Sequence, residues 1–470
     1  MSGDHPYAQR YGVTRAIPGH GRSRDEILAE LTTMAAEEDA LWETGRCSGT
    51  IYCGDHDHYA FMSRAFGLFA HMNALQRDMC PSASRFEGEI LAMVSDLLHG
   101  DAVADGGPCG VVTSGGTESI LTAMLAYREH GRRLGIRRPS IVKPETAHPA
   151  FNKACELFGI ELRVVPVDPG TTLADIDAMA ERIDDSTVAL IGSACNYGYG
   201  TVDPIPRLSE LALECGVGLH VDGCLGGFIL PWGERLGYDI PPFDFRLPGV
   251  TTISADTHKY GYGFKGTSTL LFRDPALRRG VYFFEPGWSG GKYMSPGIAG
   301  SRSVGLLAAT WAAMVAYGRD GYLERARRIF ETSDAMQAAV RRHPPLRIMG
   351  RPTFCFSITS DEFDIYLVND VLRERGWRLN GQQYPNAIHM AVTGPQTQPG
   401  VVEAWERDLA DAVDWARTHP DVTPSTGSVY GGIPGGLTPD AEAFIVEVMA
   451  DLLDRQQSLP PPDADPGSAA

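Results

Sequence analysis

Three short segments of the chain carry residue types that could act together in catalysis. Lys259 lies in a loop with Ser, Asp and Thr directly after an apolar run, Asp222 ends another apolar run, and a glycine turn at 113–119 opens a helical stretch. In this order they offer an amine for an aldehyde, a carboxylate for a ring nitrogen, and backbone amides for a phosphate. The combination predicts that the chain binds pyridoxal 5′-phosphate (PLP), with Lys259 forming a Schiff base to it.

Lys259 and Asp222 each have an ordinary interpretation as well. A lysine near a strand end is usually a solvated charge, and an aspartate there is often a helix N-cap. Because a PLP lysine must lose its proton, we expect partial burial and neighbouring positive groups to lower the pKa of Lys259. We expect Asp222 to pair with the protonated pyridine nitrogen, which keeps the ring able to accept electrons.

The cofactor phosphate is expected at the start of the helix that follows the glycine turn. There the backbone N–H groups of Gly115 and Gly116 and the hydroxyl of Thr117 would bind it. A Gly-Gly pair before a helix is common in α/β connections, so the signal comes from its position relative to the other segments. Thr257 and His258, in the lysine loop, are expected to help hold the same phosphate.

His148 stands at a predicted helix start after a strand, where a lone histidine is usually a cap or a surface residue. In this context we expect its imidazole to stack on the pyridine face of the cofactor. Cys53, His56 and His58 are metal-ligand residue types, but their loop lacks a second cluster at structural-zinc spacing. We therefore predict no metal site.

Apolar, strand-like runs alternate with helical stretches between residues 109 and 273 and must position these residues. The alternation predicts an α/β fold with a mostly parallel, seven-stranded sheet, whose carboxyl strand ends carry the ligand site. The strand-like runs lie near 109–113, 139–143, 162–167, 187–193, 217–222, 250–255 and 268–272. The helical stretches lie near 117–134, 148–158, 173–183 and 206–215.

The N-terminal region predicts an arm and two helices. Residues 1–22 are polar and indicate an extended arm, and Ser23 with Glu26 forms a capping box for a helix that runs to about Trp42. Residues 45–60 indicate a loop, and a further helix covers roughly 84–99.

The region after Ser301 predicts helices to about 317 and from about 321 to 342, followed by a smaller C-terminal α/β domain. That domain has expected strands near 353–359 and 387–393, and expected helices near 363–375, 400–418 and 439–456. The expected division is an N-terminal arm with helices (1–85), a large PLP-binding domain (86–320), the small domain (321–456) and a disordered tail (457–470).

Composition excludes several classes of partner. The 470 residues carry a formal net charge of −18, which argues against nucleic acid or an anionic membrane surface as the main partner. No apolar run approaches the roughly 20 residues that span a bilayer, and the start of the chain has no apolar signal core. Nine scattered cysteines without a CxxC pair favour a reduced, cytoplasmic setting.

From about Ser48 to about Tyr430 the chain resembles the sphingosine-1-phosphate lyase family. That family is part of the fold-type I PLP-dependent enzymes, beside the group II amino-acid decarboxylases. The His148, Asp222 and Lys259 segments point to the superfamily as a whole. Other stretches point to the lyase branch, namely 48–52, 73–75, 81–82, 293–296, 299–302 and 376–380.

The resemblance implies a homodimer with active sites at the subunit interface, and it implies retro-aldol cleavage. The substrate amine would displace Lys259, a base would take the proton of the C3 hydroxyl, and the C2–C3 bond would break to release an aldehyde. In the family the products are a long-chain aldehyde and phosphoethanolamine. Tyr197 matches a tyrosine proposed to serve proton transfer near the hydroxyl, and Lys259 is the other candidate base.

The family's substrate-phosphate pocket is matched only in part. Tyr52, Asn73 and Lys265 match it, but the histidine expected three residues after the asparagine is Gln76. Glutamine donates a hydrogen bond but cannot become cationic, so we expect weaker phosphate binding. No membrane anchor precedes the matching region, which implies a soluble, bacterial-type member.

Two other functions remain open at this point. The shared His148, Asp222 and Lys259 also suit a PLP-dependent decarboxylase of an aromatic or acidic amino acid. The altered pocket at Gln76 leaves room for a non-catalytic relative that keeps PLP as a structural or sensing ligand. The first reading is a lyase of a phosphorylated sphingoid base or a related β-hydroxy amine.

Overall fold

The structure is a computed structural model that describes residues 7–104, 106–427, 431–432 and 437–458. Three expectations fall partly or wholly outside these residues: the first six positions of the N-terminal arm, the end of the resemblance at Tyr430, and the tail from 459 onward. By its internal contacts the chain divides into two units, one of residues 1–41 with 431–470 and one of residues 42–430. The domain boundaries expected at 86, 321 and 457 stay predictions.

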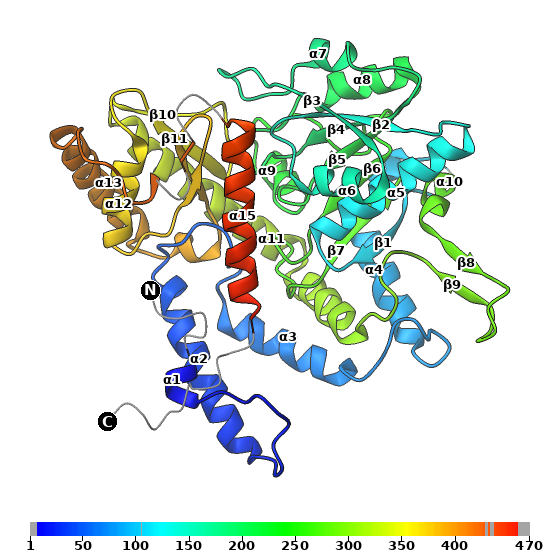
Figure 1. Ribbon diagram of the computed structural model, residues 1–470. Coiled ribbons are helices and arrows are strands. Elements are labelled where there is room, and N and C mark those ends of the chain that lie inside the picture. The colour runs from blue at the N-terminus through cyan, green and yellow to red at the C-terminus, as the bar shows by residue number, and fades with distance from the viewer. Residues whose placement is uncertain (1–6, 105, 428–430, 433–436, 459–470) are drawn as a thin grey trace. The chain divides into compact units, whose positions relative to one another are not determined.

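The larger unit is built on a seven-stranded sheet with the order β1-β7-β6-β5-β4-β2-β3 (Figure 1). All strands except β7 run parallel to one another, so the expected mostly parallel sheet is confirmed. The strands are β1 (Cys109–Thr113), β2 (Ser140–Pro144), β3 (Glu161–Val165), β4 (Thr187–Ser193), β5 (Gly218–Asp222), β6 (Thr252–Ala255) and β7 (Ser268–Phe272).

Helices cover both faces of this sheet, because successive strand residues point to opposite sides. Val111 packs with one buried cluster and Val112 with the other, and Leu270 and Leu271 alternate in the same way. One cluster includes α5 (Gly116–Arg133) and α6 (Ala150–Phe158). The other includes α4 (Pro81–Leu97), α7 (Ile176–Ala180), α8 (Ile205–Cys215), α9 (Leu230–Arg235) and α11 (Val304–Arg341).

The connection between β6 and β7 contains no α-helix. A following strand parallel to β6 would need a long crossover connection, whereas an antiparallel strand can follow a shorter loop. The next strand, β7, runs antiparallel to both β6 and β1. The loop that carries Lys259 therefore begins at the same edge of the sheet as the carboxyl ends of β4 and β5. This is the edge where a ligand site was expected.

The predicted loop at 45–60 is wrong from His56 onward, where α3 (His56–Phe69) begins. Asp55 caps this helix, because its carboxylate accepts the backbone N–H of His58. The expected break between the two helices after Ser301 is present within α11, where Gly318 has a φ of 56°. Glycine adopts this left-handed conformation without a Cβ penalty.

A second, antiparallel sheet has the order β10-β11-β13-β12. The strands expected near 353–359 and 387–393 are confirmed as β11 (Cys355–Ser360) and β13 (Ala387–Ala391). Two three-residue strands, β10 (Leu346–Ile348) and β12 (Asn380–Gln382), were not predicted. The helices α12 (Ile365–Glu374) and α13 (Val401–Thr418) lie in the same part of the chain as expected.

The remaining elements of the larger unit are short. A β-hairpin of β8 (Phe283–Glu285) and β9 (Tyr293–Ser295) follows α10 (Pro275–Arg278). Three 3-10 turns are η1 (Gly100–Ala102), η2 (Arg279–Val281) and η3 (Gly394–Thr397).

The smaller unit contains α1 (Ala8–Tyr11), most of α2 (Arg24–Glu43) and α15 (Pro439–Gln456). The arm expected to be extended contains the single turn α1, which is tied to α2 by a hydrogen bond from Tyr7 to Glu38. The predicted capping box is confirmed, since Ser23 and Glu26 each accept the other's backbone N–H. No helix in the described ranges is both long and apolar enough to cross a membrane.

His220 on β5 gives the fold a pH dependence that can be measured. Its ring is fully buried, its Nδ1 lies 2.8 Å from Thr252 Oγ1, and burial lowers its pKa to about 4. The unfolded chain protonates this ring below about pH 6.5 whereas the folded chain does not, so stability is lost as the pH falls from about 6.5 towards 4. The loss of unfolding free energy reaches about 2.5 kcal/mol by pH 4.5.

For His220→Asn, which stays neutral, we therefore expect acid unfolding at a lower pH than in the wild type. The measurement is the acid midpoint by circular dichroism at a fixed urea concentration. His71→Asn, at an exposed histidine, is the matched control and should leave the midpoint unchanged. Identical midpoints for wild type and His220→Asn would contradict the assignment.

Candidate active site

A cavity of about 470 Å³ lies at the carboxyl ends of β4 and β5, between the start of α5 and the β6–β7 loop. Of the thirteen predicted site residues, nine line it. These are Tyr52, Gly115, Gly116, Thr117, His148, Tyr197, Asp222, His258 and Lys259. Thr257, Asn73, Gln76 and Lys265 do not line it in the described part of the chain.

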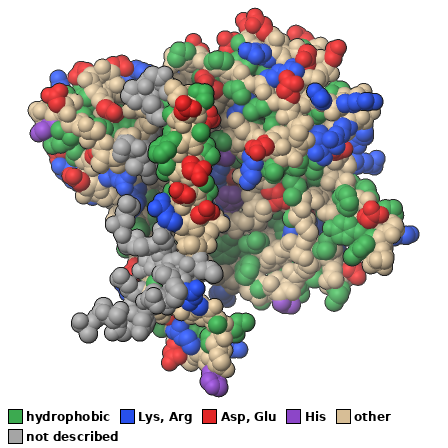
Figure 2. Space-filling view, in the orientation of Figure 1, with side chains coloured by type: hydrophobic (Ala, Val, Ile, Leu, Met, Phe, Trp, Pro, Cys, Tyr) green, Lys and Arg blue, Asp and Glu red, His purple; other side chains and the backbone are tan. Residues whose placement is uncertain are grey.

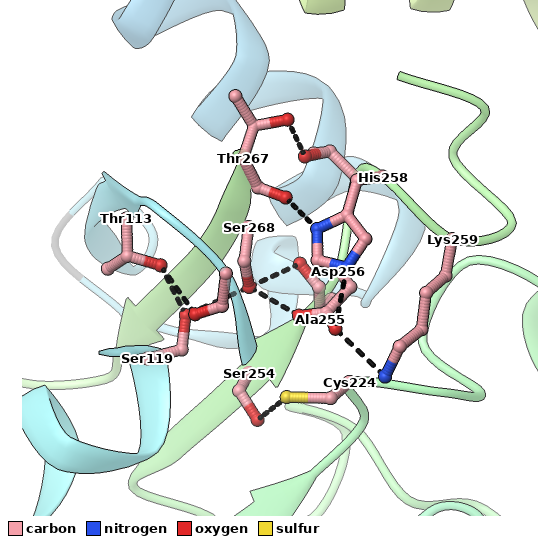
Figure 3. A network of polar contacts seen from close by, with 12 residues as sticks. Thr113, Ser119, Cys224, Ser254, Ala255, Asp256, His258, Lys259, Thr267 and Ser268 are labelled. Carbon is pink, nitrogen blue, oxygen red and sulfur yellow. Dashed lines mark hydrogen bonds and ion pairs between the residues drawn. The ribbon is translucent and has the colours of Figure 1, made fainter. Parts of the chain in front are cut away.

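Lys259 makes an ion pair with Asp256, whose Oδ2 lies 2.9 Å from its Nζ (Figure 3). Burial alone would lower the pKa of Lys259, but its interactions with Asp256, foremost, and with Cys224 and Tyr52 together outweigh burial, and the pKa is raised. The expectation of a lowered pKa is therefore wrong for the free chain. The expectation failed because it took account of burial and of positive groups near Lys259 but not of Asp256, three residues upstream.

Asp256 also organises the loop around the lysine (Figure 3). It is almost fully buried, and its Oδ1 accepts a 2.6 Å hydrogen bond from Ser268 at the start of β7. His258 donates from Nδ1 to the carbonyl of Thr267 at 2.6 Å, and its Nε2 lies 3.6 Å from Asp256 Oδ2. The loop is thus held at both ends by side chains that face the cavity.

Asp222 ends β5 beside Ser193, the last residue of β4. Its Oδ1 accepts the backbone N–H of Cys224 at 3.0 Å and the hydroxyl of Ser254 at 3.3 Å. Its Oδ2 has no hydrogen-bond partner among the described residues. The N-cap position of the next helix, α9, is Ile229, so Asp222 is not the N-cap residue of that helix.

The glycine turn forms the start of α5. The helix begins at Gly116, its N-cap is Gly115, and no side chain caps it. A Cβ at Gly116 would come within 2.8 Å of Asp256 Oδ2 and 2.9 Å of Cys224 Sγ, so only glycine leaves this wall of the cavity open. The first backbone N–H groups of a helix lack intrahelical partners and attract anions.

His148 lines the cavity from the turn before α6. Its Nδ1 accepts the backbone N–H of Ala150 at 3.1 Å, which places the ring proton of the neutral form on Nε2. Burial lowers its pKa, and the positive charge of Lys259 acts in the same direction while Asp222 opposes it. The ring is therefore neutral around pH 7 and fits the expected stacking role.

Lys265 lies behind Tyr52, outside the cavity lining. Its Nζ is 4.6 Å from the centre of the Tyr52 ring, a cation–π distance. Burial and the charge of Lys259 lower the pKa of Lys265 to about 8, and burial raises the pKa of Tyr52 to about 12. Lys265 thus contacts the ring of Tyr52, which in turn lines the cavity.

Two of the other predicted residues outside the cavity, Thr257 and Asn73, have structural partners. Thr257 is fully buried and donates its hydroxyl to Thr267 at 2.8 Å, and its expected phosphate contact stays a prediction. Asn73 donates to Ser301 at 3.0 Å, and its side-chain oxygen accepts the backbone N–H of Arg302. The side chain of Gln76 is exposed.

The residues present fit PLP. Ser193 Oγ is buried at the cavity and has no hydrogen-bond partner among the described residues, which leaves room for a polar ligand group. The uncapped start of α5 suits a phosphate, Oδ2 of Asp222 suits a cationic ring nitrogen, and Lys259 supplies the amine.

Sequence reasoning missed Asp256, Ser193 and Cys224 as parts of the site. Asp256 stands in the same run as Lys259, so its spacing of three residues was the available signal. Ser193 ends an apolar strand, as Asp222 does, and the same rule would have found it. Cys224 carries no sequence feature that marks it, and its thiol donates to Ser254 at 3.2 Å.

No three His, Cys, Asp or Glu side chains of the described residues are grouped to hold a metal ion. The residues considered as ligands have other partners. The thiol of Cys53 lies 3.2 Å from the hydroxyl of Tyr317, and His58 Nε2 donates to the carbonyl of Tyr262 at 2.9 Å.

Comparisons with known proteins bear on this geometry. The model of the pyridoxal-dependent decarboxylase conserved domain matches residues 8–358. A sphingosine-1-phosphate lyase of Arabidopsis thaliana is 42% identical over 456 residues, 96% of this chain and 82% of that protein. One from Rattus norvegicus is 36% identical over 444 residues, 93% of this chain and 77% of that protein.

Solved structures are similar over nearly the whole chain. The structure of a sphingosine-1-phosphate lyase from Burkholderia pseudomallei K96243 has a TM-score of 0.90 and 56% identity, and it covers 97% of this chain and 100% of its own. A glutamate decarboxylase from Lactobacillus brevis has a TM-score of 0.74 at 19% identity, covering 88% of this chain and 98% of its own. The latter likeness is one of fold, and together they confirm the expected fold-type I architecture.

Proposed function

Because the chain belongs to the sphingosine-1-phosphate lyase family, we propose that it cleaves the C2–C3 bond of a phosphorylated sphingoid base such as sphingosine 1-phosphate. The products are a long-chain aldehyde and phosphoethanolamine. The observation that carries the proposal is the cavity in which Lys259, Asp222 and His148 meet the uncapped start of α5.

PLP is the cofactor, and when bound it supplies the electron sink for charge released at the substrate α-carbon. Lys259 would be the amine that holds it, Asp222 would pair with its ring nitrogen, and His148 would stack on its ring. Gly115, Gly116 and Thr117 would bind its phosphate. With its ion pair to Asp256, Lys259 starts as an ammonium group and must lose a proton before it can act as a nucleophile.

Tyr197 is placed to handle the proton of the substrate C3 hydroxyl. It lines the cavity with 48% of its surface exposed, and burial raises the pKa of its phenol. Its hydroxyl has no hydrogen-bond partner among the described residues and is free to bond to substrate. A neutral phenol can hold the oxygen in place and pass a proton between it and a stronger base such as the freed Lys259.

The test is aldehyde release from sphingosine 1-phosphate by the purified holoenzyme, with unphosphorylated sphingosine as the matched substrate. We expect aldehyde and phosphoethanolamine in equal amounts from the phosphorylated form. The decarboxylase alternative is tested by measuring carbon dioxide release from a panel of aromatic and acidic amino acids. No feature of the described residues specifically favours that alternative. Any turnover removes the non-catalytic alternative, and absence of aldehyde from every β-hydroxy amine tested would remove the lyase.

We also propose that the chain acts as a homodimer in the cytoplasm. Figure 2 shows hydrophobic side chains gathered over the β8–β9 hairpin, where Phe283, Phe284 and Met294 are 58–73% exposed. Exposed apolar patches of this kind mark interfaces. Such a dimer would let Asn73 and Gln76 of one subunit reach the cavity of the other, and free cysteines among the described residues suit a reducing compartment. Light scattering after gel filtration measures the dimer.

For Gln76→His we expect tighter binding of phosphorylated substrate. A protonated imidazole would add a charge-assisted hydrogen bond to phosphate worth about 1–2 kcal/mol, or roughly 5- to 30-fold in KM. The measurement is KM for sphingosine 1-phosphate at pH 6 and pH 8, with the gain larger at pH 6. Gln76→Asn is the control without a charge, and an unchanged or raised KM for the histidine variant would show that this position does not contact phosphate.

A further inference from the structure

His389 on β13 is a fully buried histidine without hydrogen-bond partners. Its residue is 0% exposed, and neither Nδ1 nor Nε2 has a partner among the described residues. Its ring centre lies 4.6 Å from that of Tyr197, with the planes tilted by 36°. We propose that His389 is a positioning residue for Tyr197. When substrate occupies the cavity, the ring N–H of His389 donates a hydrogen bond to the backbone carbonyl of Tyr197.

A buried imidazole with two unbonded nitrogens is an unfavourable choice for packing alone. Each unpaired polar group in a dry interior destabilises the fold, whereas an apolar side chain of similar shape avoids the penalty. Groups that break a local rule of this kind are most often found at functional sites. The position next to a cavity-lining tyrosine identifies the site concerned.

The segment that directly follows Tyr197 rests on the four-stranded sheet. The carbonyl of Gly198 accepts hydrogen bonds from Ser357 and from Gln382 Nε2. At Gly200 a Cβ would clash with the carbonyl oxygen of Cys355, so the backbone passes in direct contact with β11. The neighbours of Tyr197 are fixed by β11 and β12, and its own ring contacts β13.

Tyr197 itself has no hydrogen bond from its hydroxyl to the described residues, so its ring pose depends on packing. The contact with His389 is therefore the constraint that the sheet provides. The main chain at His389 cannot shift easily, because Ser48 donates to its carbonyl at 3.1 Å and accepts the N–H of Ala391 at 2.9 Å.

The protonation state of His389 suits a donor to a carbonyl. Burial lowers its pKa to about 4, and the backbone of Tyr197 acts in the opposite direction. The ring is neutral at neutral pH and carries one N–H and one lone pair. The Tyr197 backbone is thus near enough to act on the ring, while a bond of normal geometry is not formed in this state.

Substitutions at 389 separate a donor from a packing residue. His389→Phe and the smaller His389→Leu remove both nitrogens, and we expect Tm to rise by about 2–4 °C in at least one of them, since buried unpaired groups are lost. At the same time we expect kcat to fall at least tenfold with KM changed less than twofold. His389→Gln and His389→Asn each restore an N–H, at different distances from the main chain. We expect at least one of them to have a kcat at least threefold higher than that of His389→Phe or His389→Leu. A fully active His389→Phe or His389→Leu, or recovery by neither amide, would overturn the proposal.

A double-mutant cycle tests whether the effect passes through Tyr197. In a Tyr197→Phe background, which keeps the ring but removes the hydroxyl, we expect His389→Phe to lower kcat less than twofold further. A full tenfold further loss would show that His389 acts elsewhere and would overturn the proposal.

The inference rests on the proposed function for its kinetic readout, so a structural readout is included. The crystal structure of the wild type should show the Tyr197 side chain in a single conformation. The crystal structure of His389→Leu should show it in more than one conformation. If the wild type fails to cleave sphingosine 1-phosphate, the proposed function fails while this comparison still decides the positioning role. An identical single Tyr197 pose in both structures would end the inference.

Discussion

Lys259→Arg is expected to abolish aldehyde release, lowering kcat by at least about a thousandfold while the fold stays intact. Arginine keeps the ion pair with Asp256, which lies 2.9 Å from the lysine Nζ, but its guanidinium does not lose a proton near neutral pH and cannot serve as the amine nucleophile. The variant therefore separates charge from chemistry at this position.

Two readouts check this expectation. The first is turnover of sphingosine 1-phosphate, and the second is the visible absorbance of cofactor that stays with the protein after dialysis. Both should be lost in Lys259→Arg and in Lys259→Ala, with lower stability only in the alanine variant because it removes the lysine ammonium group that pairs with buried Asp256. Lys153→Ala, at an exposed lysine of α6, is the control. Retention of the absorbance in Lys259→Arg would show that another lysine holds the cofactor.

Asp222→Asn should be the next most damaging change. Asparagine can still accept hydrogen bonds from the Cys224 N–H and the Ser254 hydroxyl, so the local structure should persist. It cannot supply the negative charge that keeps a ring nitrogen protonated, and the site loses its hold on charge developing at the substrate carbon. We expect kcat to fall about 100-fold or more, which corresponds to about 3 kcal/mol.

Ser254→Ala is the matched control for this prediction. It removes one hydrogen bond to Asp222 Oδ1 but leaves the charge, so we expect less than a tenfold loss of kcat. The two variants are compared under saturating PLP, with thermal melting to confirm folding. A serine variant as damaged as the asparagine variant would mean that orientation, and not charge, is what Asp222 provides.

The strands of the main sheet could be predicted from sequence because both faces are covered. A strand such as β4, buried along its whole length, is a continuous apolar run that ends abruptly, and its end marks the site edge. The helix α3 was missed because its predicted loop was judged by its Cys and His residues, and the Asp55 cap went unnoticed. The three-residue β12 is too short to leave a pattern, and pairing with β13 defines it.

The residues that line the cavity could largely be predicted from the sequence, but the electrostatics of the site could not. Lys259, Asp222 and the Gly115–Gly116 turn converge as expected because parallel strand ends share one edge. The direction of the Lys259 pKa depends on where the Asp256 carboxylate points, which is a matter of side-chain rotamers and not of composition. Gln76 stands where the family's phosphate pocket is expected to have a histidine, and its side chain is exposed in the single chain.

Because β7 runs antiparallel to its neighbours, its first residue contacts both the helix expected to bind the cofactor phosphate and the loop that carries Lys259. Its first residue, Ser268, pairs with Thr113 at the end of β1, and its Oγ lies 2.9 Å from that of Ser119 and 2.6 Å from Asp256 Oδ1. The start of α5 and the Lys259 loop follow β1 and β6, which flank β7 on its two sides. Because neighbouring strands lie about 4.8 Å apart, β7 sets the separation of the proposed phosphate and amine sites at roughly two strand spacings.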